Sequence, residues 1–287
     1  MIVRRTLWDT CLALTVGVFL CGVASCTPHS RHDSAEQSKP AESIQTNNPG
    51  NAAAQYNLGR LYAEGRGMPR DYAKAAELFQ KAAGQGYAPA QTGLGWLYQF
   101  GRGVPQDYVK AAEFFQKAAD QGNGEALTRL AFLYENGWGV PHDQAKASEL
   151  YQKAAALFQK MADKGDAAAQ ARLGIMYKYG RGVAQDYFKA AELLQRAADQ
   201  GHAPAQTSLA LLYKFGQGVS QDYAKAAELF QKAAEQGYAL AQLNLGVLYE
   251  QGQGVPKDYA KAAELYRKAA GQDGKDVKNA AHGEEPQ

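Results

Sequence analysis

One phrase of nine residues occurs six times along this chain of 287 residues, and it constrains the fold more than any other feature. It first appears at residues 54–62 (AQYNLGRLY) and returns from Ala90, Ala126, Ala169, Ala205 and Ala241, at spacings of 36, 36, 43, 36 and 36 residues. A period of about 20 to 50 residues indicates stacked repeats that bury one continuous core between neighbours. We therefore predict six repeats over residues 52–274, which start near 52, 88, 124, 167, 203 and 239.

Each repeat is predicted to form two antiparallel helices. In the first helix Leu58, Leu61 and Tyr62 follow the i, i+3, i+4 spacing of a buried helical stripe. A Gly-x-Gly turn ends that helix, because glycine tolerates a positive φ. An aspartate then opens the alanine-rich second helix as its N-cap, at Asp71, Asp107, Asp143, Asp186, Asp222 and Asp258. The pattern predicts an all-α fold, an α-solenoid of stacked antiparallel helix pairs.

The third repeat contains seven extra residues. Residues 150–155 (LYQKAA) are echoed by residues 157–162 (LFQKMA). Seven residues turn a helix by about 700°, roughly 20° short of two full turns, so the apolar stripe stays nearly in register. We expect the second helix of this repeat to be about 10 Å longer than its counterparts. The alternative is a tolerated duplication with no role of its own.

The repeated phrase resembles the Sel-one-like repeat (SLR), a relative of the tetratricopeptide repeat, over 223 of the 287 residues. Local departures are Gln144 in place of a tyrosine, and Ala131 and Ala210 in place of a glycine. The resemblance implies a non-enzymatic scaffold or adaptor that binds a protein or peptide in the cell envelope. Some cysteine-rich SLR proteins have been linked to β-lactam hydrolysis. These repeats contain no cysteine, so a β-lactamase-like hydrolase is the least favoured alternative.

The N-terminus carries the features of a secretion signal. Arg4 and Arg5 precede an apolar run of 13 residues, 11–23, which suits a signal peptide, whereas a membrane-spanning helix needs about 20. The run ends in Val-Ala-Ser-Cys26, which resembles a bacterial lipoprotein lipobox. This resemblance implies a signal peptide over 1–25, lipidation and palmitate at Cys26, and an outer-membrane lipoprotein that faces the periplasm or the cell surface. The alternative is an ordinary signal peptide with an incidental cysteine.

The segments on either side of the repeats are polar. Residues 26–51 are rich in Ser, Pro, Asn and Gln, and they lack the apolar surface that would offset the entropy of ordering. We expect a flexible tether there and a disordered tail over 275–287. The membrane would therefore be contacted through the N-terminal lipid only.

The sequence shows no set of residues typical of catalysis, metal binding or nucleic-acid binding. All three cysteines lie in the first 26 residues, and the five histidines have no acid or nucleophile at a recognisable spacing. The chain has 31 Lys and Arg against 29 Asp and Glu, whereas nucleic-acid binding needs a clear excess of cations. We predict no catalytic residue, no metal site, no cofactor and no nucleic-acid partner.

A candidate partner surface comes from positions that vary between repeats. Three positions on one side of the first helix, 57, 60 and 64 in the first repeat, change from copy to copy. The resemblance implies that first helices line an inner, concave wall, and Trp, Tyr and Arg are typical energetic centres of interfaces. The expected groove residues are Trp96, Phe100, Arg129, Phe132, Arg172, Tyr179, Leu211 and Phe215.

Two alternatives to a protein groove stay open. Some of these side chains can instead pack between successive helix pairs and contribute only to the core. The aromatic stripe can also bind a polysaccharide or peptidoglycan, as part of an export or assembly complex. Pull-down and glycan-binding assays separate a protein partner from a glycan partner.

Overall fold

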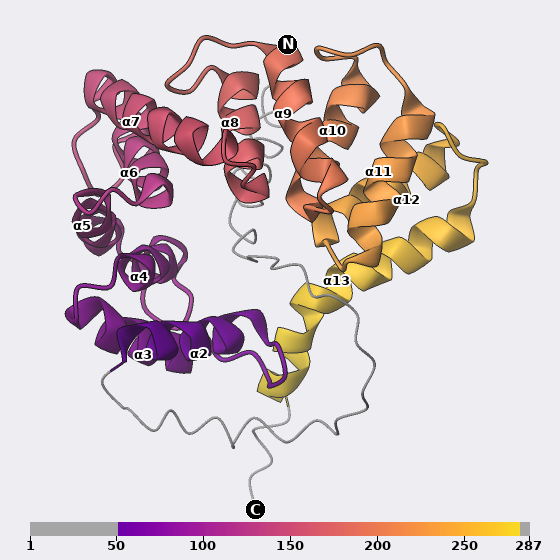
Figure 1. The fold of residues 1–287 in the computed structure, drawn as a ribbon. Helices are drawn as coiled ribbons and strands as arrows, with labels where there is room; N and C mark the ends of the chain where they lie inside the picture. Colours follow the sequence, from indigo (N-terminus) through magenta and orange to yellow (C-terminus); the bar gives the residue numbers. More distant parts are fainter. Residues whose placement is uncertain (1–50, 282–287) are drawn as a thin grey trace, which may run out of the picture. The chain divides into compact units, whose positions relative to one another are not determined.

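The computed structural model describes the chain from Asn51 to Ala281, with side chains as far as Gly271. Cys26, the expected signal peptide and nearly all of the expected tether lie outside the described residues. In the described range there are helices and turns but no strand (Figure 1). The helices are α2 (Ala52–Glu64), α3 (Tyr72–Gly84), α4 (Ala88–Phe100), α5 (Tyr108–Ala119), α6 (Gly124–Asn136), α7 (Gln144–Ala162), α8 (Ala167–Tyr179), α9 (Tyr187–Asp199), α10 (Ala203–Phe215), α11 (Tyr223–Glu235), α12 (Ala239–Gln251) and α13 (Tyr259–Ala281).

The helices form pairs that stack within two compact units, which confirms the predicted all-α fold. In the described chain the N-terminal unit holds residues 51–158 and 181–183, and the C-terminal unit holds 159–180 and 184–281. Within each unit a second helix packs both on its own first helix and on the first helix of the next repeat, as α3 does with α2 and α4. Alanines such as Ala75 and Ala82 are fully buried there and let the helices approach closely.

The helix ends follow the predicted capping. The carboxylate of Asp71 accepts the N–H of Lys74 at 2.9 Å, and the same bond, three residues apart, recurs at the start of all five later second helices. Each first helix ends on a glycine with φ between 64° and 70°. These bonds satisfy backbone groups that a helix end leaves unpaired. The repeated aspartates and glycines are therefore structural residues.

The second glycine of each Gly-x-Gly turn lies against the preceding repeat. A Cβ atom added to Gly103 would lie 2.3 Å from the carbonyl carbon of Tyr72, the first residue of α3. Gly139, Gly182, Gly218 and Gly254 meet a tyrosine of the preceding second helix in the same way. At Gly67 in the first repeat, a Cβ would meet nothing within 4 Å. The turn thus needs glycine for two reasons, its positive φ and this contact.

A buried glutamine also links successive repeats. Gln206 of α10 is 4% exposed; its amide donates to the carbonyl of Ala198 in α9 at 3.3 Å, and its Oε1 accepts from Gln236 at 2.8 Å. Gln91 and Gln170 make the same two contacts in their repeats. The Ala198 carbonyl also accepts the N–H of Gly201 at 2.9 Å, so the glutamine adds a second hydrogen bond at the end of the neighbouring helix and links two repeats.

The seven extra residues lengthen α7 to 19 residues, against 13 in α3, a difference of about 9 Å. The predicted longer helix is thereby confirmed. Its buried residues Ala147, Leu150, Tyr151, Ala154, Phe158 and Ala162 keep one helical face through both copies of the duplicated stretch. The insertion therefore extends the apolar face without rotating it.

Tyr151 of α7 serves two positions of the repeat at once. Its hydroxyl donates to Glu135 of α6 at 2.9 Å, from the position that Phe115 occupies in the preceding repeat. Its backbone carbonyl also lies against Gly182, just as the carbonyl of Tyr108 lies against Gly139 in the preceding repeat. The turn at residues 181–183 therefore contacts α7 seven residues further along the helix than the equivalent turn contacts α5. This turn and Tyr151 belong to the same unit.

The last helix differs from the expected end of the repeats. We predicted a disordered tail from residue 275, but the backbone of α13 is helical as far as Ala281. No proline interrupts residues 259–281, and lysine, glutamine and alanine there favour a helix. Residues 282–287 lie outside the described range.

Candidate functional site

In the N-terminal unit the expected groove residue Trp96 packs between a tyrosine of the preceding helix pair and the expected groove residue Phe100. The ring of Trp96 in α4 lies 6.1 Å from that of Tyr72 and 5.4 Å from that of Phe100. The guanidinium of Arg102 lies 5.6 Å from the centre of the Tyr72 ring. Trp96 and Phe100 are half-buried, so they stabilise the stack and still present an edge to solvent.

Phe132 repeats this arrangement one helix pair later. Its ring lies 5.4 Å from that of Trp138, which in turn lies 5.2 Å from that of Tyr108. The guanidinium of Arg181 lies 5.7 Å from the centre of the Phe132 ring and 3.1 Å from Glu135. Trp138 remains 40% exposed. We call Tyr72, Trp96, Phe100, Tyr108, Phe132 and Trp138 the aromatic ladder.

Half of this ladder was missed by the sequence reasoning. Tyr72 and Tyr108 begin second helices, and Trp138 lies in a Gly-x-Gly turn, so none of the three belongs to the variable positions of a first helix. The signal that could have found Trp138 is the variation of the middle residue of the Gly-x-Gly turn from repeat to repeat. In the second and third repeats this residue lies near a tyrosine ring of the preceding second helix. Arg102 occupies this position in the second repeat, and Trp138 occupies it in the third.

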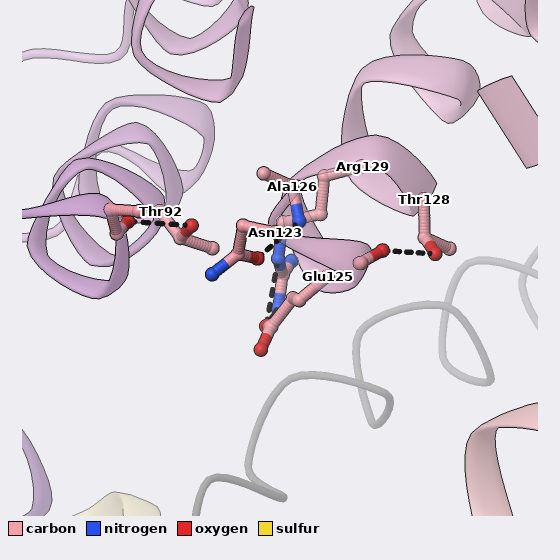
Figure 2. Close-up of polar contacts among 8 residues, drawn as sticks. Thr92, Asn123, Glu125, Ala126, Thr128 and Arg129 are labelled. Atoms are coloured by element: carbon pink, nitrogen blue, oxygen red, sulfur yellow. Dashed lines mark hydrogen bonds and ion pairs between the residues drawn. The ribbon is translucent and has the colours of Figure 1, made fainter. Parts of the chain in front are cut away.

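Arg129 is held inside the unit and does not lie on the candidate surface. It is 9% exposed, and its guanidinium donates to Glu125 one turn away, at 2.6 and 3.0 Å. Figure 2 shows this pair beside the capping bond of Asn123, at the start of α6. The expected polar anchor therefore acts within the chain, because burial favours pairing with the nearest carboxylate.

The C-terminal unit contains a pocket of about 60 Å³ between α8, α10 and the start of α12. Three of the expected groove residues, Arg172, Tyr179 and Leu211, line it. Ile175 and Leu240 add apolar wall, and Lys178 and His202 add polar groups. We call this the C-terminal pocket.

Burial perturbs the titratable groups of this pocket. It lowers the pKa of the Lys178 ammonium to about 8, because the charged form loses hydration. Burial, together with the nearby Arg172 charge, lowers the pKa of His202 to about 4. The His202 Nδ1 accepts the N–H of Ala205 at 3.2 Å, so the neutral ring carries its proton on Nε2 as a donor.

Phe215 lies outside the C-terminal pocket. It is 60% exposed at the end of α10, and the Lys214 ammonium lies 5.5 Å from its ring centre. Of the expected groove residues, Phe215 and Tyr179 are thus the most exposed, at 60% and 40%.

Among the side chains of residues 51–271 the structure offers no group of three His, Cys, Asp or Glu arranged to bind a metal ion. None of the helices in that range has the length and hydrophobicity to cross a bilayer.

Comparison with known proteins gives one family. The model of the Sel1 repeat matches residues 52–87, 88–123, 124–157, 153–166, 167–202, 203–238 and 239–274. The short match at 153–166 includes the second copy of the duplicated stretch. A comparison with curated proteins finds no match.

Solved structures with the same fold include a Sel1 repeat protein from Oxalobacter formigenes. That protein is 31% identical, with 76% of this chain and 85% of that chain covered and a TM-score of 0.54. Two immunity proteins from Pseudomonas aeruginosa, Pa5087 and PA5088, are each 24% identical, with TM-scores of 0.54 and 0.53. The matches cover 77% and 83% of this chain and 82% and 89% of those proteins. These two likenesses concern the fold alone.

Proposed function

Because the chain belongs to the Sel1 repeat family, whose members typically act as scaffolds for protein–protein interaction, we propose that it is a non-enzymatic adaptor of the bacterial cell envelope. It holds a protein or peptide segment through the side chains that vary along its first helices. A lipid at Cys26 anchors it in the outer membrane, so that it faces the periplasm or the cell surface.

One observation supports the binding role above the others. The residues common to the repeats are engaged within the chain, as caps, turn glycines and buried glutamines. The residues that differ between repeats include partly exposed aromatic and apolar side chains, among them Trp96, Phe132, Tyr179 and Leu211. The residues that the repeats share thus stabilise the stack of helices, while the residues that differ between repeats form the surface that can recognise one partner. Partly enclosed aromatic side chains of this kind are typical energetic centres of interfaces.

Site-specific photo-crosslinking in cells tests the binding role. We expect a photoreactive residue at position 215 or 138 to join the chain to one defined partner. The same residue at position 188 is the control, because Phe188 is 71% exposed but lies on a second helix. The same products from all three positions, or no product from 215 and 138, would count against the proposal.

The anchor needs its own test. We expect a fatty-acid analogue to label the wild-type chain, and Cys26→Ser to remove both the label and the membrane fraction. Unchanged labelling in Cys26→Ser would refute lipidation at that residue without touching the binding role.

A second candidate function is favoured by Trp138. Its 40% exposed indole beside Tyr108 is the kind of aromatic surface on which a sugar ring stacks. Binding of peptidoglycan or another polysaccharide that is lost in Trp138→Ala would favour a glycan partner. If the Trp138→Ala variant binds the glycan as well as the wild-type chain does, the result would argue against a glycan partner at this surface.

A further inference from the structure

Two successive repeats of the C-terminal unit carry a lysine at one position of the first helix, Lys178 in α8 and Lys214 in α10. The other repeats have Ala63, Gln99, Glu135 and Glu250 there. Both glutamates have a partner from the second helix: Glu135 accepts from Tyr151 at 2.9 Å, and Glu250 accepts from Tyr266 at 2.7 Å. In the two lysine repeats the residues equivalent to these tyrosines are Leu194 and Phe230.

Among the side chains of residues 51–271, no carboxylate pairs with either lysine. Burial is the only influence that lowers the pKa of Lys178 and of Lys214, and no acid opposes it. Each ammonium lies instead near the ring of the next residue, at 5.2 Å from Tyr179 and 5.5 Å from Phe215. A partly buried ammonium costs free energy unless an opposite charge compensates it.

The surroundings of Lys178 favour an anion. The charged and titratable groups that line the C-terminal pocket include Arg172, Lys178 and His202, and among the described residues no Asp or Glu lines it. One acid that acts on this lining is Asp166, whose charge affects His202 but not Lys178. The pocket also reaches Leu240 at the start of α12, where no described side chain caps the helix. The first turn of a helix carries a partial positive charge and backbone N–H donors.

We propose that Lys178 and Lys214 bind an acidic segment of the partner protein, with one carboxylate at Lys178 and an adjacent apolar side chain against Ile175 and Leu211. This inference rests on the proposed adaptor function and specifies the chemistry of the partner. Leu211 and Lys214 lie three residues apart on α10 and so share a helix face.

The geometry sets the spacing of the acidic residues. Because α8 and α10 are in contact, their axes lie about 10 Å apart. An extended peptide covers that distance in about three residues. A segment with two carboxylates three residues apart and an apolar residue between them therefore fits both lysines. The apolar residue between the two carboxylates would lie against Ile175 and Leu211 in the C-terminal pocket.

Fluorescence anisotropy with two labelled peptides tests the proposal on the full chain. One peptide has Glu at every third position with Leu between, and the other has Gln in place of each Glu. We expect the acidic peptide to bind at least about tenfold more tightly. The double variant Lys178→Gln/Lys214→Gln, which introduces the residue found at position 99, should abolish that difference. The control Lys189→Gln/Lys232→Gln removes the same charge from exposed second-helix positions and should retain it.

Several results would overturn the proposal. These are equal binding of the two peptides, no binding of either, an equal loss in the control variant, or displacement of the acidic peptide by inorganic phosphate or by vesicles of anionic phospholipid at similar concentrations. The crosslinking at positions 138 and 215 separates this inference from the proposed function. A defined crosslinked partner without preference for the acidic peptide would refute the acidic segment alone.

Discussion

The contact between each Gly-x-Gly turn and the preceding repeat leads to a sharp prediction, because the chain contains its own control. Gly103 and Gly67 occupy the same position in successive repeats and have φ values of 69° and 73°. Only Gly103 lies against another helix. We compare Gly103→Ala with Gly67→Ala.

The expected magnitudes follow from the geometry. An alanine at positive φ costs about 1–2 kcal/mol, and Gly67→Ala should show this cost alone. At position 103 the new methyl group would also lie 2.3 Å from the Tyr72 carbonyl, against about 3.5 Å for an ordinary contact. The turn must move by roughly 1 Å, and such overpacking costs a further ~1–3 kcal/mol. Gly103→Ala should therefore destabilise the chain by about 2–5 kcal/mol.

Urea unfolding followed by tryptophan fluorescence measures the difference. A protein that begins at residue 27 lacks Trp8 and keeps Trp96 and Trp138, both in the N-terminal unit. Trp96 lies beside Tyr72, so its emission also reports whether the turn has moved. Equal destabilisation by the two substitutions would refute the second role assigned to Gly103.

Three further predictions concern the core and the buried charge. Gln206→Leu should cost only about 0.5–1.5 kcal/mol in urea unfolding followed by circular dichroism. It removes two hydrogen bonds, but the Ala198 carbonyl keeps the Gly201 N–H and the Gln236 amide keeps the Lys232 carbonyl. A loss above about 3 kcal/mol would show that these remaining bonds do not compensate. Leu133→Ala should cost about 2–5 kcal/mol in urea unfolding, since Leu133 is fully buried; a loss well under 1 kcal/mol would show that the site is not core. The lowered pKa of Lys178 means that this side chain binds more protons in the unfolded chain than in the folded chain between pH 8 and 10.5, so its contribution to stability should rise with pH there, by at most about 3 kcal/mol. The raised pKa values of Tyr56, Tyr151 and Tyr266 act in the opposite direction near pH 10, so the range to compare is pH 8 to about 9.5. Thermal unfolding across that range should show the rise in wild type and in Lys232→Gln, and a much smaller one in Lys178→Gln.

Much of the fold could be predicted from the sequence because the determinants are local. Asp71 and its five counterparts act within one turn of their helix, and the stripe around Leu94 and Leu97 depends on helical periodicity. The heptad spacing of the duplicated stretch predicted the length of α7 in the same way. A repeat also multiplies each signal, since six copies identify a position that one copy would leave ambiguous.

The candidate site was predicted less completely, because its determinants lie between repeats. Arg129 belongs to the variable stripe, but its pairing with Glu125 depends on how deeply α6 is buried. The second role of Gly103 and the buried position of Gln206 appear only when one helix pair is placed on the next. The missing counter-charge at Lys178 is likewise a property of the surrounding helices, which periodicity alone does not reveal.

The dual role of Tyr151 limits the lengths that this chain can adopt at its third repeat. When a helix lengthens by seven residues, the side chains after the insertion face almost the same direction as before. Three or four added residues would rotate those side chains about the helix axis by about 60° or 40°. Such a rotation would carry Phe158 and Ala162 away from the positions in which they are now enclosed. Growth or shrinkage of this element is therefore confined to changes close to a whole number of helical turns, of which about 7, 11 and 18 residues are the smallest well-matched steps.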